Sequence, residues 1–335
     1  MVGLAKNTGK TVALRSVLDE LQDAGSVVGV TSVGRDGERF DVIDSRIRKP
    51  SVRLWAGSLL ATTDSLIRSS GVRYELVKQT GIRTPLGAVV VCRLLETGEI
   101  EVAGPSAASD VRLVSEVMCA SGAQHVLIDG AIDRRAASCP EVSEAVLMST
   151  GAVLDEQPER VAQRTRDAVE LMRLSVPADP ATRALAQTSV SSLLIDRAGQ
   201  AVQLRPRLAL DGGEMELARL LRRDPTPRSL VLRGAVCEPF LDALVRANRG
   251  RELEVVVQDS TKVFLSRHSY AWYRAYGLTL RALSPIRLLA ITVNPLAPCA
   301  HRVDSDWLRG LIESEIDDVP VLDVLHPSYV LGAAA

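Results

Sequence analysis

The chain has 335 residues, 46% hydrophobic and 24% charged, which is the composition of a globular protein long enough to form two hydrophobic cores. A formal net charge of −1 and an aromatic content of 3% argue against nucleic acid or an anionic membrane as the main partner. The five cysteines and four histidines show no metal-ligand spacing, which excludes a zinc-finger class and favours a reducing compartment. No secretory leader and no apolar run of about 18 residues is found, so we expect a cytoplasmic protein.

Short apolar strands and helices alternate in the first half of the chain. A strand end at residues 2–5 leads through a glycine-containing loop into a helix at 9–24, and a buried strand follows at 26–33. Further on we expect these elements: a helix at 61–69, a strand at 74–77, a hairpin or two closely joined strands at 88–95 and 99–103, a helix at 108–120 and a strand at 125–129. This alternation predicts a parallel α/β layer.

The pattern pauses near residues 149–151, and a proline-containing connection at 175–183 is a candidate boundary. After the pause we expect helices at 156–174, 214–222, 238–248 and 305–315, and strands at 191–195, 229–232, 253–257, 286–293 and 319–324. The second half is therefore predicted to be another α/β unit. We expect a first domain at residues 1–152 and a C-terminal domain at 153–335, which would bind a partner.

The opening stretch GLAKNTGKT has the residue types of a phosphate-binding loop. Such a loop needs backbone N–H groups that face an anion, a helix N-terminus, a lysine for the outer phosphates and a hydroxyl for Mg²⁺. Gly9, Lys10 and Thr11 supply the last three positions in the usual order, although five residues separate Gly3 from Gly9. The alternative is a helix that merely begins with these residues. The residues expected to contact the nucleotide are Gly3, Lys6, Asn7, Thr8, Gly9, Lys10, Thr11 and Val12.

Acidic and amide side chains follow several predicted strands, at the edge where parallel α/β sheets bind ligands. Asp129 ends one strand and is expected to orient Mg²⁺ or its water, whereas Asp36 follows another and would position the metal or the attacking water. Asn294 follows a third strand and would contact the nucleotide base or cap a helix. We expect Lys10, Asp36 and Asp129 to act in catalysis, and Thr11, Asp36 and Asp129 to hold the metal.

Other polar groups have simpler interpretations. Lys49 and the acids Glu38 and Asp41 suit solvated turns as well as they suit a site, and Gly104 with Ser106 suits the loop that precedes a helix. The stretch 259–262 follows a strand in a similar way. His326 has no visible partner, so no nucleophile–base pair is proposed.

The loop resembles those of the SIMIBI class of P-loop NTPases, and its spacing is similar to that of dethiobiotin synthetase. A longer resemblance runs through GVTSVGRDGE, RKPSVRLWAGSLLATT, TGIRTPLGAVVV, VAGPS, LIDGAIDR and STGA, and extends to ITVNPLAP. These motifs resemble the ATP-binding reactivase subunit that serves adenosylcobalamin-dependent lysine 5,6-aminomutase and ornithine 4,5-aminomutase. The fold class that follows is α/β, with a P-loop parallel sheet, flanking helices and a second α/β domain.

The resemblance implies an ATP- and Mg²⁺-dependent, chaperone-like activity in which inactivated cobalamin is exchanged on an aminomutase. It carries the phosphate and metal roles to Lys10 and Thr11, the metal-side acid to Asp129 and the γ-phosphate sensor to Asp36. A ligase like dethiobiotin synthetase, acting on a small carboxylate or amine, and a GTPase metallochaperone are the alternatives. The sequence leaves open a second reactivase subunit, a homodimer, and the choice between ATP and GTP.

Overall fold

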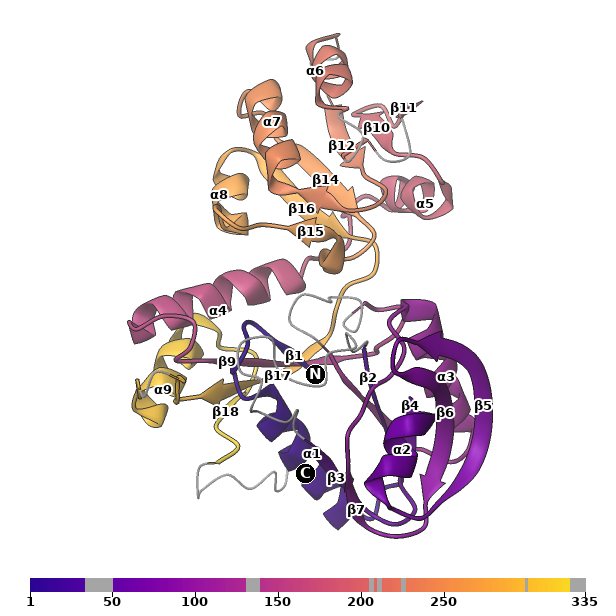
Figure 1. Ribbon diagram of the computed structural model, residues 1–335. Helices are drawn as coiled ribbons and strands as arrows, with labels where there is room; N and C mark the ends of the chain where they lie inside the picture. Colours follow the sequence, from indigo (N-terminus) through magenta and orange to yellow (C-terminus); the bar gives the residue numbers. More distant parts are fainter. Residues whose placement is uncertain are drawn as a thin grey trace. The chain divides into compact units, whose positions relative to one another are not determined.

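The computed structural model describes residues 1–33, 51–130, 139–204, 208–209, 213–223, 227–298 and 301–325. The protein is of the mixed α/β class and forms two compact units, Met1–Gln163 with Leu288–Ala335, and Arg164–Arg287 (Figure 1). The expected division at residue 152 differs from this arrangement, because the structure groups residues 288–335 with the first unit. The chain thus leaves the first unit and later returns to it.

The first unit is built on two sheets with strand orders β5-β6-β4-β2-β8 and β1-β9-β17-β18. Only β5 and β6 introduce antiparallel pairing into these two sheets; the other neighbours are parallel. Their bounds are β1 Val2–Gly3, β2 Val28–Ser32, β4 Leu59–Thr63, β5 Tyr74–Thr84, β6 Gly87–Leu94, β8 His125–Asp129, β9 Val146–Gly151, β17 Leu288–Asn294 and β18 Val321–Leu322. A separate antiparallel pair consists of β3 Val52–Leu54 and β7 Gly98–Ile100.

Backbone hydrogen bonds at Met1 join the two sheets. The Met1 nitrogen donates to the Ile128 carbonyl oxygen at 2.8 Å, and the Gly130 N–H donates to the Met1 carbonyl oxygen at 3.0 Å. This is the parallel ladder pattern, with Met1 opposite Asp129. On the other side, the Leu4 N–H donates to Ser149 O at 3.0 Å. The β1 strand is therefore paired with β9, and Met1, directly before it, is hydrogen-bonded to the end of β8.

Helices of the first unit cover both faces of the sheet that contains β4. They are α1 Lys10–Asp23, α2 Asp64–Ser70, α3 Ala108–Ala120 and α9 Ser305–Glu315, and α4 Pro158–Met172 runs from this unit into the next. In β4, Leu60 packs in one apolar cluster with Leu14 of α1, whereas Leu59 and Ala61 pack in another with Met118 of α3. Successive strand residues point to opposite faces, so this alternation places α1 and α3 on different sides.

The local sequence explains where α1 ends. Gly25 has φ +70°, its N–H donates to Gln22 O, and the Ser26 N–H donates to Leu21 O. A glycine in the left-handed region is the common helix C-terminal signal, because it has no Cβ to clash with the following carbonyl. The expected helices at 9–24, 108–120 and 305–315 and the strand at 125–129 are confirmed.

Three expectations for the first unit are wrong. Residues 61–63 belong to β4, whose five residues are all buried, and α2 begins only at Asp64, because burial in the sheet outweighs local helix preference. The strand at 74–84 is longer than expected and forms a hairpin with β6. Of the two alternatives for 88–95 and 99–103, the structure has closely joined strands and not a hairpin, because β7 pairs with β3. The pause near 149–151 is in fact β9, an interior strand between β1 and β17.

The second unit has its own five-stranded sheet, of order β11-β10-β12-β14-β16, in which β12, β14 and β16 are parallel and β10 pairs antiparallel with β11 and β12. The strands are β10 Leu193–Asp196, β11 Ala201–Gln203, β12 Pro227–Val231, β14 Leu253–Val257 and β16 Leu278–Ala282, with a small parallel pair of β13 Val236–Cys237 and β15 Val263–Phe264. Its helices are α5 Pro180–Thr188, α6 Glu214–Arg223, α7 Glu238–Asn248 and α8 Tyr270–Ala275.

The expected helices at 214–222 and 238–248 and the strand at 253–257 are confirmed. The connection expected at 175–183 includes the start of α5, whose N-cap Asp179 accepts a hydrogen bond from the Thr182 N–H at 3.0 Å. Aspartate before Pro180 is a recognised helix start, since proline suits the first helical position. The proline at this point therefore begins a helix and does not mark a linker.

Candidate functional site

The ends of several parallel strands of the first unit bring the candidate residues to one edge of the sheet. Ser32 at the end of β2 is in register with Asp129 at the end of β8, and Gly151 at the end of β9 is in register with Asn294 at the end of β17. The strand β1 pairs with β9, Met1 before it bonds to the end of β8, and the last residue of β1 leads into the loop. This edge is where parallel α/β sheets bind ligands.

The loop between β1 and α1 folds tightly on itself. The Thr8 side chain is buried, and its Oγ1 donates to the Ala5 carbonyl oxygen at 3.0 Å. A Cβ on Gly3 would lie 2.6 Å from that Oγ1, so the close approach requires glycine. Asn7 and Gly9 have φ of 66° and 83°, and these left-handed residues turn the chain into the helix. The Gly-five-residues-Gly spacing therefore produces a compact turn.

The N-terminus of α1 is open to an anion. Gly9 caps the helix without a side-chain hydrogen bond, and the first turn holds no acidic residue. The first hydrogen bond into the helix runs from the Ala13 N–H to Gly9 O at 2.9 Å. Helix geometry leaves the N–H groups of Lys10, Thr11 and Val12 without acceptors inside α1. These donors and the helix dipole favour a negatively charged ligand.

Lys10 and Asp129 meet beside the loop. Lys10 Nζ lies 3.1 Å from Asp129 Oδ1 and also donates to the Gly130 carbonyl oxygen. The exposed fractions of the two side chains are 19% and 27%, so the pair is partly shielded from solvent. Asp129 Oδ1 is buried and faces the Lys10 ammonium, and a carboxylate oxygen of this kind is also a ligand that hard cations prefer.

Asn294 holds the loop from the neighbouring strand β17. Its Nδ2 donates to the Asn7 carbonyl oxygen at 2.8 Å, and its Oδ1 accepts from the Leu296 N–H at 3.1 Å. A Cβ on Gly9 would lie 3.1 Å from Asn294 Cβ, and a Cβ on Gly151 would collide with the Asn294 carbonyl oxygen. Both polar atoms of this amide are thus used to position backbone.

The structure therefore brings together Gly3, Asn7, Thr8, Gly9, Lys10, Asp129 and Asn294. Thr11 and Val12 occupy the first turn of α1, and Lys6 is exposed in the loop. Asp36, Glu38, Asp41, Lys49 and His326 lie outside the described residues.

Sequence reasoning missed two features of this edge. Gly151 allows β17 to approach β9 closely, and its signal was a glycine directly after an apolar run. Gly104 is pressed against the end of β2: its N–H donates to Ser32 Oγ at 3.0 Å, and a Cβ there would collide with the Ser32 carbonyl oxygen. The sequence analysis interpreted residues 104–106 as a loop before α3. The structure adds that Gly104 packs against the end of β2, the strand beside Asp129.

Comparison of the chain with protein-family models, with curated proteins and with solved structures gives no match. None of the helices in the described part of the chain has both the length and the apolar character needed to cross a bilayer. The described ranges also hold no group of three or more His, Cys, Asp or Glu side chains arranged for a metal ion. The geometry of the loop must therefore carry the functional argument.

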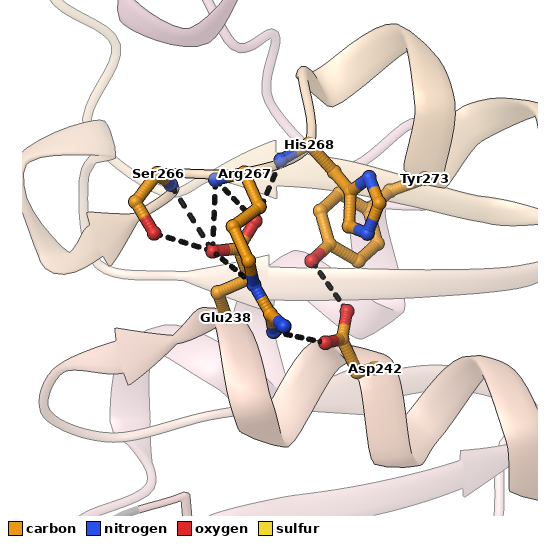
Figure 2. A network of polar contacts seen from close by, with 6 residues as sticks. All are labelled: Glu238, Asp242, Ser266, Arg267, His268 and Tyr273. Carbon is orange, nitrogen blue, oxygen red and sulfur yellow. Dashed lines mark hydrogen bonds and ion pairs between the residues drawn. The ribbon is translucent and has the colours of Figure 1, made fainter.

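The second unit contains a dense polar network around Glu238, at the start of α7 (Figure 2). Its buried carboxylate accepts hydrogen bonds from the Ser266 hydroxyl at 2.5 Å, the Arg267 N–H at 2.9 Å and the His268 N–H at 2.7 Å. Burial alone would raise the pKa of Glu238, but these hydrogen bonds outweigh it and hold the pKa at about 2.

Asp242, one turn along α7, completes this network. It accepts hydrogen bonds from the Tyr273 hydroxyl at 2.8 Å and from Arg267 Nη2 at 2.7 Å. Burial, together with the hydrogen bond to Asp242, raises the pKa of Tyr273. Each of these polar groups has a hydrogen-bond partner within the network, and these bonds hold α7 against residues 266–273.

The acidic residue of the stretch 259–262 has a similar local role. Asp259 is buried and accepts hydrogen bonds from both the N–H and the hydroxyl of Thr261, at the start of the short 3₁₀ helix Ser260–Lys262. Its carboxylate therefore caps this turn.

Proposed function

We propose that the first unit binds ATP with Mg²⁺ at the loop formed by residues 3–11 and hydrolyses it. The observation that carries the proposal is the meeting of three features at one sheet edge. A glycine-dependent turn, an uncapped helix N-terminus and the Lys10–Asp129 pair lie together there. A phosphate site needs these features, since it combines N–H donors, a helix dipole and a compact cation.

The residues present fit a bound metal and phosphate. Asp129 Oδ1 is buried with the Lys10 ammonium 3.1 Å away, and Thr11 stands in the first turn of α1. In this interpretation Thr11 and Asp129 would hold Mg²⁺ and Lys10 would bind the outer phosphates. Bound Mg²⁺ would neutralise part of the charge on the phosphates. Asp36 remains a proposed metal and catalytic residue on the basis of its place after β2.

The Lys10–Asp129 contact supports the proposal in a second way. In a triphosphate complex, Lys10 would exchange a carboxylate for phosphate oxygens, and Asp129 would exchange an ammonium for a metal ion. Each group would keep an opposite charge beside it, so neither partly buried charge would be left unpaired. Lys6, Asn7 and Thr8 would then cover the phosphates with backbone, with Asn294 holding the loop in place.

The test is a titration of the full chain with a fluorescent ATP analogue in the presence of Mg²⁺. Lys10→Ala should weaken binding by about a hundredfold or more, because a charged hydrogen-bonding partner of the phosphates is lost. Lys78→Ala is the matched control, since Lys78 is exposed on β5 and should have no effect. Unchanged binding by the Lys10 variant would refute the assignment of the loop.

We further propose that ATP turnover drives a reactivase function on an adenosylcobalamin-dependent aminomutase. The sequence motifs that resemble the reactivase subunits support it, and a separate α/β unit for partner binding accords with it. For nucleotide binding to remodel a partner, the two nucleotide states must differ in their affinity for that partner.

Adding an aminomutase should stimulate ATP hydrolysis and release inactive cobalamin. The mutase should also be retained on the immobilised chain in one nucleotide state more than in the other. Turnover that appears only with a small carboxylate or amine would instead favour the ligase alternative and would contradict the reactivase proposal.

A further inference from the structure

The second unit carries a groove between α6 and α7, and arginines dominate its charged lining. The two helices pack against each other and enclose a groove of about 350 Å³. Its basic lining residues are Arg219, Arg222, Arg246 and Arg249. The described lining residues include no acidic side chain, and none of the four guanidinium groups has a carboxylate partner in the described part of the chain.

This concentration of charge opposes the stability of the free unit. Arg219 and Arg222 are three residues apart on one helix, and Arg246 faces the same groove from the other helix. Like charges at such spacings repel each other. The dipole of α7 favours Arg246 in its last turn and Arg249 at its C-cap. It does not explain why both helices direct their arginines into one groove of a chain whose net charge is −1.

The apolar part of the described lining, which we call the floor of the groove, has one long and three small side chains. It consists of Met215, Ala218, Ala243 and Ala247. Met215 is 69% exposed although methionine is apolar, and its flexible thioether adapts to different partner surfaces. The three alanines let a partner backbone approach closely. The described lining residues include no aromatic side chain, and they therefore offer no stacking surface of the kind on which single-stranded nucleic acids depend.

Both walls of the groove are held in place from behind. Leu217 and Leu221 of α6 and Phe240 and Leu244 of α7 are buried in one apolar cluster. Arg251 Nη2 donates to the Leu221 carbonyl oxygen at 3.1 Å, which ties the end of α6 to the chain that follows α7. The Glu238 network anchors the other end of α7 (Figure 2). A preformed groove loses little conformational entropy when it binds.

We infer that this groove docks an acidic amphipathic helix of a partner protein. Apolar residues of that helix, spaced i, i+3, i+4 and i+7, would lie on the Met215 and alanine floor. Carboxylates on its flanks would pair with the four arginines, whose planar groups bind carboxylates through two parallel hydrogen bonds. Binding would also remove the repulsion among the arginines.

The inference goes beyond the proposed nucleotide function and stands independently of it. The groove belongs to the second unit and shares no residue with the loop of the first. Lys10→Ala, which should abolish ATP binding, should therefore leave helix docking without nucleotide unchanged. Failure of one proposal can thus be distinguished from failure of the other.

The test is a selection from a displayed library of helical peptides of about 20 residues, carried out on the full chain. The enriched peptides should be acidic and should show the i, i+3, i+4, i+7 apolar spacing. Fluorescence anisotropy of an enriched peptide should show binding that weakens by about tenfold or more when salt is raised from about 0.05 to 0.3 M.

Charge reversal locates the binding. Arg219→Glu with Arg246→Glu should weaken binding at least about tenfold, whereas Arg219→Lys with Arg246→Lys should retain most of it, because the positive charge is kept. Both positions are exposed, and circular dichroism should show that the double variants remain folded. Met215→Ser, a change on the exposed floor, should weaken binding without altering its salt dependence.

Three results would overturn the inference. The enriched peptides could lack acidic residues, or they could bind the charge-reversed variant as tightly as the native chain. Alternatively, a single-stranded oligonucleotide could bind more tightly than the peptides and lose its binding in the same variant, which would assign the groove to nucleic acid.

Discussion

Asn294, the last residue of β17, donates a hydrogen bond from Nδ2 to the carbonyl oxygen of Asn7, 2.8 Å away and 287 positions distant in the chain. The strand that returns from the second unit thus ends on the loop proposed to bind phosphates. Asn7 has a left-handed backbone conformation, which is less costly for asparagine than for most residues. The hydrogen bond helps to hold that conformation.

Asn294→Ala should therefore weaken nucleotide binding without unfolding the protein. Loss of one neutral hydrogen bond costs roughly 1 kcal/mol, which corresponds to about fivefold in affinity. Isothermal titration with ATP and Mg²⁺ measures the change. Asn294→Asp is the second variant: it keeps the acceptor for the Leu296 N–H, loses the donor to Asn7 and adds a negative charge beside the loop, so it should weaken binding more than Asn294→Ala. Native affinity in both variants would contradict a role for the contact.

Gly9→Ala should affect the loop more than the same change at Gly25. Both glycines have positive φ, so each substitution costs about 1 kcal/mol or more in backbone strain. A Cβ at Gly9 would also lie 3.1 Å from Asn294 Cβ, whereas nothing lies within 4 Å of a Cβ at Gly25. We expect both variants to have lower melting temperatures and only Gly9→Ala to have lost nucleotide affinity. Equal affinity in the two would show that the loop tolerates the shift.

Asp129→Asn should raise the Mg²⁺ concentration needed for nucleotide binding. A neutral amide is a poorer ligand for a hard cation than a carboxylate, so we expect a shift of about tenfold or more. The substitution also removes the carboxylate that competes for Lys10, and binding of metal-free ATP should therefore be unchanged or tighter. Titrations of ATP at several Mg²⁺ concentrations separate the two effects. Equal losses with and without Mg²⁺ would argue against a metal role.

Glu238 should make the stability of the second unit depend on pH in the acidic range. Its pKa is lowered from 4.5 to about 2, so its contribution is complete above pH 4.5 and is lost as the pH falls towards 2. Glu238→Gln should lower the free energy of unfolding at neutral pH by about 1.5–3 kcal/mol, because the hydrogen bonds lose their charged acceptor. The substitution should also reduce the steepness with which the free energy of unfolding falls at acidic pH.

The fluorescence of Trp272 can report on this unit alone. The other two tryptophans, Trp55 and Trp307, belong to the first unit and can be replaced by phenylalanine in the reference protein. Glu252→Gln is the control, since Glu252 is exposed in the same unit and its substitution should change stability by less than about 0.5 kcal/mol. A decline of the same slope with and without Glu238 would assign the acid sensitivity to other carboxylates.

The sequence predictions succeeded where the interactions that decide an element lie within one short segment, and failed where those interactions join segments far apart in the chain. Helices α3, α7 and α9 were predicted with the bounds that the structure has, because each carries its apolar stripe and its end signals within a dozen or so residues. The short apolar runs were harder. Residues 146–151 were not recognised as a strand, and residues 61–63 were assigned to a helix, since burial in a sheet depends on neighbours far away in the chain.

By itself the sequence determined the α/β class, the glycine-dependent loop before α1 and the presence of acidic and amide residues after the strands, because these depend on local periodicity and local backbone preferences. Only the tertiary structure decided that Lys10 faces Asp129, that Asn294 holds Asn7, that residues 288–335 return to the first unit and that four arginines share one groove. Each of those facts depends on which strands and helices become neighbours. Which elements become neighbours is decided by the burial of entire apolar faces of helices and sheets, and no single segment of the sequence encodes it.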